Sequence, residues 1–152
     1  MTELLFTSRP LSASPISWAN AATRIRTKGM VDHVALLKDG MVYESVVKKG
    51  VSKTPYKNWI LGREGTMLIR VQVPDEAYDF DVFEAYRGTK YDTPAIAYLF
   101  FGLYKMLKSK SLKRIFCSEL IAMMRYDKAP YHVTPYDELR LWDGNPSTIT
   151  II

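Results

Sequence analysis

The stretch VDHVALLKDGMVYESVV, residues 31–47, decides how the chain begins to fold. In it, two runs rich in apolar and β-branched residues flank Asp39 and Gly40. An Asp-Gly pair between such runs is the strongest short-range signal for a β-hairpin, because both turn residues tolerate a positive φ. With a two-residue turn, Lys38 lies opposite Met41, and the rest of the register follows from that pair.

This register predicts a contact between a histidine and a glutamate. Counting outward from the turn places Ala35 opposite Glu44 and His33 opposite Val46. His33 and Glu44 are then diagonal neighbours on one face, about 7–8 Å apart at the backbone. Glu44 can accept a hydrogen bond from the His33 ring and hold its orientation, and the apolar surroundings favour such a pair. A three-residue turn would put the two on opposite faces, and in the simpler alternative both are ordinary polar strand residues.

The second informative stretch is RIFCSELIAMM, residues 114–124, which holds the single cysteine, Cys117. The apolar residues after it fall at helical spacing, so Cys117 lies in the first turn of a predicted helix. A helix N-terminus stabilises a thiolate, and its unpaired N–H groups can hold an oxyanion. The alternative is that Cys117 is a small buried hydrophobic residue.

The remaining segments predict an α+β domain. Residues 66–73 read as a strand that Pro74 ends, and residues 1–15 and 52–65 as irregular, with Trp59 packing on the core. Helices are predicted at 16–26 and at 75–87, the second ended by Gly88. A third helix begins at Tyr91-Asp92-Thr93-Pro94 and runs to about 108, and a fourth begins at Thr134 with a capping box. Residues 148–152 are predicted to form an edge strand.

Composition is that of one globular domain, residues 1–152, with 47% hydrophobic and 24% charged residues. One cysteine excludes an intrachain disulfide, and one cysteine with two histidines cannot supply the usual zinc ligands, so we expect no metal or other cofactor. The first residues lack the pattern of a signal peptide, and no apolar window is long enough to span a bilayer. We therefore expect a soluble, cytoplasmic chain.

The net charge of +5 comes in large part from one cationic cluster. Such a cluster can contact an anionic partner, for example a phosphate, a membrane surface or the cell wall. The simpler interpretation is a solvated helix end whose lysines complement the helix dipole. No RNA-binding or helix-turn-helix signature accompanies it, so we expect no nucleic-acid partner. The cluster consists of Lys105, Lys108, Lys110, Lys113 and Arg114.

Seven short pieces of the chain, taken in order, match motifs of one enzyme family. They are Ile16–Trp18, Asp32–Leu36, Val42–Glu44, Lys49–Val51, Lys90–Asp92, Phe116–Leu120 and Val133–Asp137. Over about residues 9–140 the chain resembles the circularly permuted branch of the NlpC-type papain-like cysteine hydrolases. That branch includes YiiX- and YebB-like proteins and, more distantly, the lecithin retinol acyltransferase group. In it the histidine precedes the cysteine, as His33 precedes Cys117 here.

The resemblance implies a papain-like fold, with an antiparallel sheet packed against the helix that bears the nucleophile. It assigns Cys117 as the nucleophile of a thiol hydrolase or cysteine peptidase, His33 as general base and Glu44 as the group that orients His33. The backbone N–H groups of Cys117 and Ser118 would hold the oxyanion. The substrate it suggests is an amide, such as a cell-wall peptide or an N-acyl amino acid.

Two further positions are candidates for the pocket. Asp32 stands where many relatives carry serine or another small or polar residue, and it either shapes the site or lies at the surface. Tyr91 and Asp92 match a family motif, but their physical interpretation is a buried aromatic residue and a helix cap.

Three alternatives remain open from the sequence. His132, between Pro130 and Pro135, is a rival base, although it reads as a loop residue. The scaffold could instead be a non-catalytic module that binds an acyl chain or a lipid. It could also be a lipid-ester hydrolase or acyltransferase at a membrane surface, with the lysines as the electrostatic contact. A cell-wall substrate would require export, or a phage or lysis context.

Overall fold

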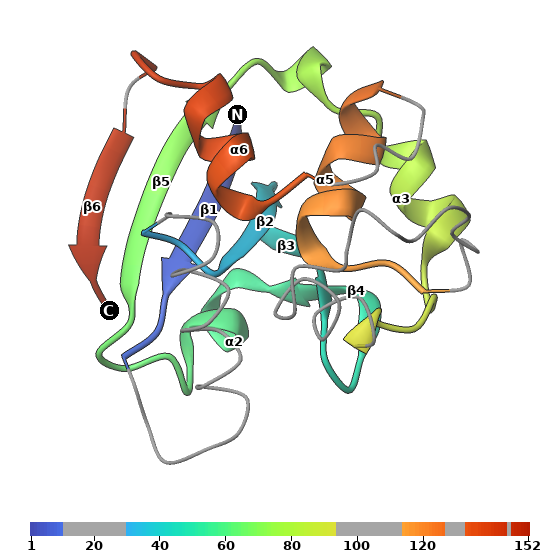
Figure 1. Cartoon of the computed structure of the whole chain (residues 1–152), viewed down its shortest axis with the longest axis horizontal. Helices are drawn as coiled ribbons and strands as arrows, with labels where there is room; N and C mark the ends of the chain where they lie inside the picture. Colours follow the sequence, from blue (N-terminus) through green and yellow to red (C-terminus); the bar gives the residue numbers. More distant parts are fainter. Residues whose placement is uncertain (11–29, 94–113, 127–132, 146) are drawn as a thin grey trace.

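The computed structural model describes residues 1–10, 30–93, 114–126, 133–145 and 147–152, and its elements form one six-stranded sheet with helices on both faces (Figure 1). Every strand pairs antiparallel to its neighbours, in the order β4-β3-β2-β1-β5-β6. The strands are β1 (Thr2–Ser8), β2 (His33–Lys38), β3 (Met41–Val46), β4 (Gly50–Pro55), β5 (Met67–Val73) and β6 (Ser147–Ile151).

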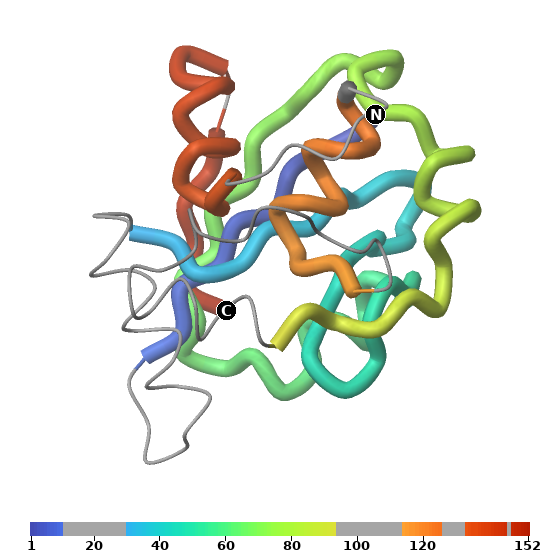
Figure 2. Tube along the Cα trace, turned by 45° about the vertical axis from the view of Figure 1, so that its right-hand side comes forward, coloured from blue at the N-terminus to red at the C-terminus, as the bar shows by residue number. Residues whose placement is uncertain are grey.

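The helices are short, and most of them gather on one face of the sheet. On that face α5 packs across β2 and β3, and α3 and α6 pack against α5 (Figure 2). The described helices are α2 (Tyr56–Ile60), the 3-10 helix η1 (Asp75–Ala77), α3 (Phe80–Tyr86), α5 (Cys117–Tyr126) and α6 (Pro135–Leu141). The α+β class and the antiparallel sheet packed on the Cys117 helix are therefore as predicted.

The predicted hairpin is present with its two-residue turn. Asp39 has a φ of 50° and Gly40 a φ of 72°, and Lys38 pairs with Met41. The ladder between β2 and β3 runs only as far as the pair Leu36 and Tyr43. The predicted pairs of Ala35 with Glu44 and of His33 with Val46 lie beyond that end, where the two strands part.

The interpretation of residues 1–15 as irregular was wrong for residues 2–8. Those residues form β1, which pairs with β2 on one side and β5 on the other. Leu4 and Phe6 pack on one face of the sheet and Leu5 on the other, so β1 is buried on both faces. A strand buried on both faces lacks the apolar–polar alternation that marks a half-exposed strand, and a short apolar run is ambiguous.

The interpretation of residues 52–65 as loop was also wrong in its first half. Residues 50–55 form β4, an edge strand with a polar sequence, and residues 56–60 form α2. Trp59 is buried as predicted, with Leu5, Ala35 and Leu68, in the cluster on the second face. Burying such side chains stabilises the fold by about 1.5–3 kcal/mol each.

Other predictions agree with the structure except at their boundaries. The helix predicted at 75–87 is divided, because α3 begins only after Asp79, whose side chain accepts a hydrogen bond from the Asp81 N–H. Thr134 caps α6 in a capping box, and β6 is the edge strand. The predicted helices at 16–26 and from 94 to about 108, the lysines from Lys105 to Lys113 and His132 lie outside the described residues.

Candidate active site

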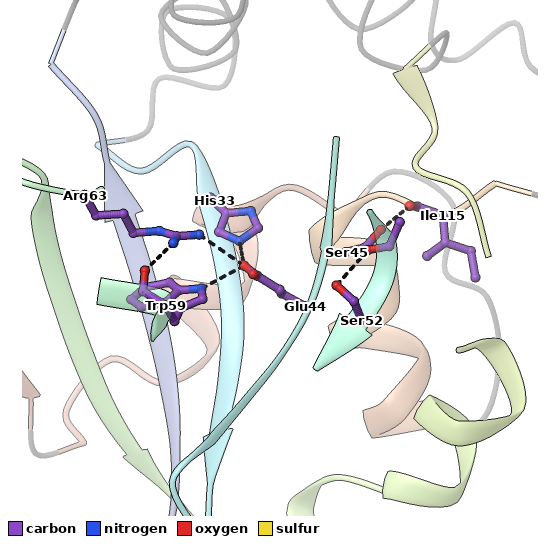
Figure 3. A network of polar contacts seen from close by, with 8 residues as sticks. His33, Glu44, Ser45, Ser52, Trp59, Arg63 and Ile115 are labelled. Atoms are coloured by element: carbon purple, nitrogen blue, oxygen red, sulfur yellow. Dashed lines mark hydrogen bonds and ion pairs between the residues drawn. The ribbon is translucent and has the colours of Figure 1, made fainter. Parts of the chain in front are cut away.

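His33 and Glu44 meet where β2 and β3 part. The His33 Nε2 atom lies 2.8 Å from Glu44 Oε2, and both side chains are largely buried (Figure 3). The predicted contact is therefore present. It forms past the end of the β2–β3 ladder, where the space between the strands admits other side chains.

Glu44 has two more partners, an indole N–H that donates to it and a guanidinium in ion-pair range, both from the segment after β4. Trp59 Nε1 donates to Glu44 Oε2 over 2.9 Å, and the Arg63 guanidinium lies 3.6 Å from the same oxygen (Figure 3). Arg63 stacks over the Trp59 ring at 4.0 Å and donates to the Trp59 carbonyl. Burial on its own would raise the pKa of Glu44, but His33, Trp59 and Arg63 together lower it. Glu44 is thus a buried carboxylate held in its charged form.

Cys117 is the first residue of α5 and is 3% exposed. Its thiol interacts with the His33 ring. Burial on its own lowers the pKa of His33, but the charge and hydrogen bond of Cys117, followed by those of Glu44, raise the pKa to about 10. Since Nε2 bonds Glu44, the ring nitrogen left for Cys117 is Nδ1.

The segments before and after the α5 N-terminus are tied to the sheet and to a loop. Ser45, buried next to Glu44 on β3, donates to the Ile115 carbonyl over 2.6 Å. Ile115 in turn donates to the Lys90 carbonyl over 2.9 Å. Ser118 donates to the Val133 carbonyl over 2.7 Å. These bonds fix Cys117 between β3, the 88–91 segment and the loop before α6.

Gly50 allows the 88–91 segment to approach the sheet closely. Val51 N donates to the Thr89 carbonyl over 2.8 Å, and Gly88 N donates to the Val51 carbonyl over 2.9 Å. A Cβ on Gly50 would lie 2.1 Å from the Thr89 carbonyl oxygen. Only glycine fits there, and this contact places Tyr91 beside Cys117.

Tyr91 is half-buried and interacts with the thiol. Burial first, and then the charge and hydrogen bond of Cys117, raise the pKa of Tyr91 well above its ordinary value. The phenol therefore stays protonated and can donate. Asp32, the residue before His33, is buried and accepts a hydrogen bond from Arg9 N over 3.2 Å. It is thus a buried residue of the site and not a surface residue.

These residues border a pocket of about 420 Å³. Cys117 itself does not line the pocket, but His33 and Tyr91 line it and both interact with Cys117. In the parts of the chain that the structure describes, no group of three or more His, Cys, Asp or Glu side chains could hold a metal ion. The pocket is lined by Arg9, Asp32, His33, Glu44, Val46, Val47, Lys48, Lys49, Thr54, Asn58, Trp59, Leu61, Arg63 and Tyr91.

Four of the predicted site side chains, His33, Glu44, Asp32 and Tyr91, line the pocket, and the fifth, Cys117, interacts with His33 and Tyr91 from the start of α5. Sequence reasoning missed Trp59 and Arg63 as partners of Glu44. Arg63 lies past the end of α2, so no helical spacing pointed to this pair. It also missed Ser45 and Gly50, for which only the tertiary contacts give a reason.

Comparison with known proteins adds no relative. No model of a known protein family matches the chain, and no curated protein matches it significantly. Within the described ranges, no helix combines the length and the apolar character needed to cross a membrane.

Proposed function

We propose that the protein is a cysteine hydrolase that cleaves an amide bond through a thioester. The observation that carries the proposal is the placement of His33 between two partners, Cys117 at the first residue of α5 and the buried Glu44, beside a pocket. A nucleophile, a base and a group that orients the base are the parts that covalent acyl transfer requires.

Glu44 prepares His33 for this role. Its carboxylate receives His33 Nε2–H, so Nδ1 faces the thiol and can take its proton. Trp59 and Arg63 hold the carboxylate in position and charged. The raised pKa of His33 means that the ring readily holds the proton that it takes from the thiol.

In the reaction, the Cys117 sulfur attacks the carbonyl carbon and its proton passes to His33. The oxyanion is held by the N–H groups of Cys117 and Ser118, which have no partner within the helix at its first turn. The Tyr91 hydroxyl, kept protonated beside the sulfur, is a third donor. His33 protonates the leaving amine as the C–N bond breaks. Water then attacks the thioester, with His33 as base, and releases the acid and the free thiol.

The scaffold that suits this chemistry is a permuted, NlpC-like papain fold. The histidine strand β2 precedes the cysteine helix α5 along the chain, and α5 packs on β2 and β3. The choice of an amide over a lipid ester rests on the motif resemblance. Of the cationic cluster considered as a membrane contact, Arg114 alone lies among the described residues, and it is exposed.

The decisive experiment is alkylation of Cys117 by iodoacetamide, measured from about pH 4 to 10. We expect reaction to persist below about pH 7, whereas a free thiol reacts only as the pH nears about 8.5. His33→Gln should abolish the low-pH reaction. His132→Gln is the matched control, since the chain has two histidines, and it should leave the profile unchanged.

Turnover of a panel of N-acyl amino acids and short peptides then tests the reaction class. Cys117→Ala should lower kcat/KM by about 10³-fold or more on any substrate found. A thiol that reacts only near pH 8.5, or loss of the low-pH limb in His132→Gln alone, would refute the assignment of Cys117 and His33. Ligand binding that Cys117→Ser leaves intact, with no turnover by the wild type, would identify a binding module instead.

A further inference from the structure

The pocket beside Cys117 carries more positive than negative side chains. Both of its carboxylates are already engaged: Glu44 receives His33, Trp59 and Arg63, and Asp32 receives the Arg9 N–H. The cationic side chains that line it are Arg9, Arg63, Lys48 and Lys49.

The two guanidinium groups act on one another. The pKa of Arg63 is lowered, first by burial and then by the charge of Arg9, while Glu44 opposes the shift. The Arg63 head is nevertheless held in place, stacked on the Trp59 ring and bonded to the Trp59 carbonyl. Arg9 and Arg63 both line the pocket with the same charge, so an anion bound there would offset their repulsion.

The turn between β3 and β4 adds two lysines to the rim. Lys48 has a φ of 81°, a left-handed backbone conformation that residues other than Gly, Asn and Asp seldom adopt. Gly50, two residues later, holds the start of β4 against Thr89. Lys48 and Lys49 are both exposed and line the pocket, so their charges face solvent at its mouth.

From this arrangement we infer that the substrate carries an anionic group, a carboxylate or a phosphate, close to the bond that is cleaved, and that Arg63, Lys48 and Lys49 recognise it. The inference rests on the proposed function for the position of the reacting bond. It adds a specificity that the Cys117–His33 pair alone does not provide. Neutral amides of the same size should be poor substrates.

A matched pair of alkylating agents tests the inference without a known substrate. Iodoacetate and iodoacetamide have nearly the same size and differ in one negative charge. The quantity to measure is the ratio of their rates at Cys117, at about pH 7 and low salt, in the wild type and in Lys48→Gln/Lys49→Gln. Protonated His33 attracts iodoacetate in both proteins, so the change between variants isolates the lysines.

We expect the double substitution to lower the iodoacetate-to-iodoacetamide ratio by about threefold to tenfold, with a smaller change at about 0.5 M salt because salt screens exposed charges. Lys57→Gln/Arg140→Gln is the charge-matched control. Both of its residues are exposed and neither lines the pocket, so the ratio should stay at the wild-type value. Protection of Cys117 by N-acetylalanine indicates a carboxylate site, and protection by inorganic phosphate alone indicates a phosphate site. An equal ratio in all three proteins, with no protection by either anion, would overturn the inference.

A second measurement keeps the inference independent of thiol chemistry. In Cys117→Ala, binding of N-acetylalanine and of its neutral amide can be compared by calorimetry or NMR titration. Preference for the carboxylate, lost on adding Lys48→Gln/Lys49→Gln, supports the anion site even if Cys117 proves unreactive. Equal binding of the two compounds refutes it even if Cys117 reacts as proposed.

Discussion

Two buried glutamates, each paired with an arginine, have pKa values that are shifted in opposite directions. Glu44, at the parting of β2 and β3, has a lowered pKa, whereas Glu138, on α6 and facing α5, has a raised one. Glu138 is completely buried, and its Oε1 atom accepts a hydrogen bond from Arg125 over 2.9 Å. Its Oε2 atom has no hydrogen-bond partner among the residues described. Burial therefore outweighs Arg125 at Glu138.

The difference lies in the number of donors and not in the presence of an arginine. Glu44 receives an imidazole, an indole N–H and a guanidinium, and this set overcomes the cost of burial. Among the described residues, Arg125 is the cationic partner of Glu138, and the pair joins α5 and α6. A carboxylate held charged beside a histidine is what acid–base chemistry needs, while a carboxylate poorly compensated for burial is a structural contact.

The largest effect is expected from disturbing the close contact of Gly50 with the 88–91 segment, which places Tyr91 beside Cys117. Gly50→Ala places a Cβ 2.1 Å from the Thr89 carbonyl oxygen, so the 88–91 segment must move. We expect a loss of roughly 3 kcal/mol or more in the free energy of unfolding, together with slower alkylation of Cys117. Urea denaturation and iodoacetamide kinetics measure the two effects.

Gly88→Ala is the matched control for that substitution. Gly88 has a φ of 83°, close to the 67° of Gly50, but a Cβ added to it would meet no atom of another segment within 4 Å. It should lose only the roughly 1–2 kcal/mol that a left-handed residue costs. Equal losses for the two variants would show that the close approach at Thr89 does not support the site.

An intermediate effect is expected from neutralising each glutamate in turn. Glu44→Gln removes the charge that two hydrogen-bond partners and Arg63 share, and it should cost about 2–3 kcal/mol, because hydrogen bonds to charged groups are the stronger ones. Glu138→Gln should cost less, about 1 kcal/mol, because the amide oxygen can still accept the hydrogen bond of Arg125 and the carboxylate that it replaces is poorly compensated for burial. Urea denaturation at neutral pH compares them. A larger loss for Glu138→Gln than for Glu44→Gln would reverse the comparison.

The smallest effect is expected in the alkaline dependence of stability. Above about pH 8.5 the unfolded chain holds a proton on neither its cysteine nor its histidine. Folded His33 keeps its proton up to a pKa of about 10. The raised pKa stabilises the fold at lower pH, so the free energy of unfolding should fall as the pH rises from about 8.5 to 10. A difference of one bound proton between the folded and unfolded states changes the free energy of unfolding by up to about 1.4 kcal/mol per pH unit.

His33→Gln removes this contribution while leaving the other alkaline groups in place. The difference between the stability curves of the wild type and the variant therefore isolates His33, and it should shrink over that range of pH. A constant difference would mean that His33 is not held in its protonated form by Glu44 and Cys117. The same series below about pH 4.5 follows Glu44, whose lowered pKa makes its stabilising contribution fall as the pH falls.

Predictions from the sequence succeeded where a few neighbouring residues decide the outcome. Asp39 and Gly40 set the hairpin turn, Thr134 caps α6, and Cys117 begins α5. The contact of His33 with Glu44 followed from the turn, although it forms past the end of the ladder. The part of the site that was missed, Trp59 with Arg63, comes from a segment interpreted as a loop.

The sequence by itself determined the local elements and the order in which His33, Glu44 and Cys117 occur, because turns, caps and amphipathic helices depend on residues a few positions apart. Only the tertiary structure decided that β1 lies inside the sheet, that Trp59 and Arg63 join His33 around Glu44, and that Gly50 brings Tyr91 to Cys117. These contacts join segments far apart in the chain. They depend on burial and close backbone approach, which no local pattern records.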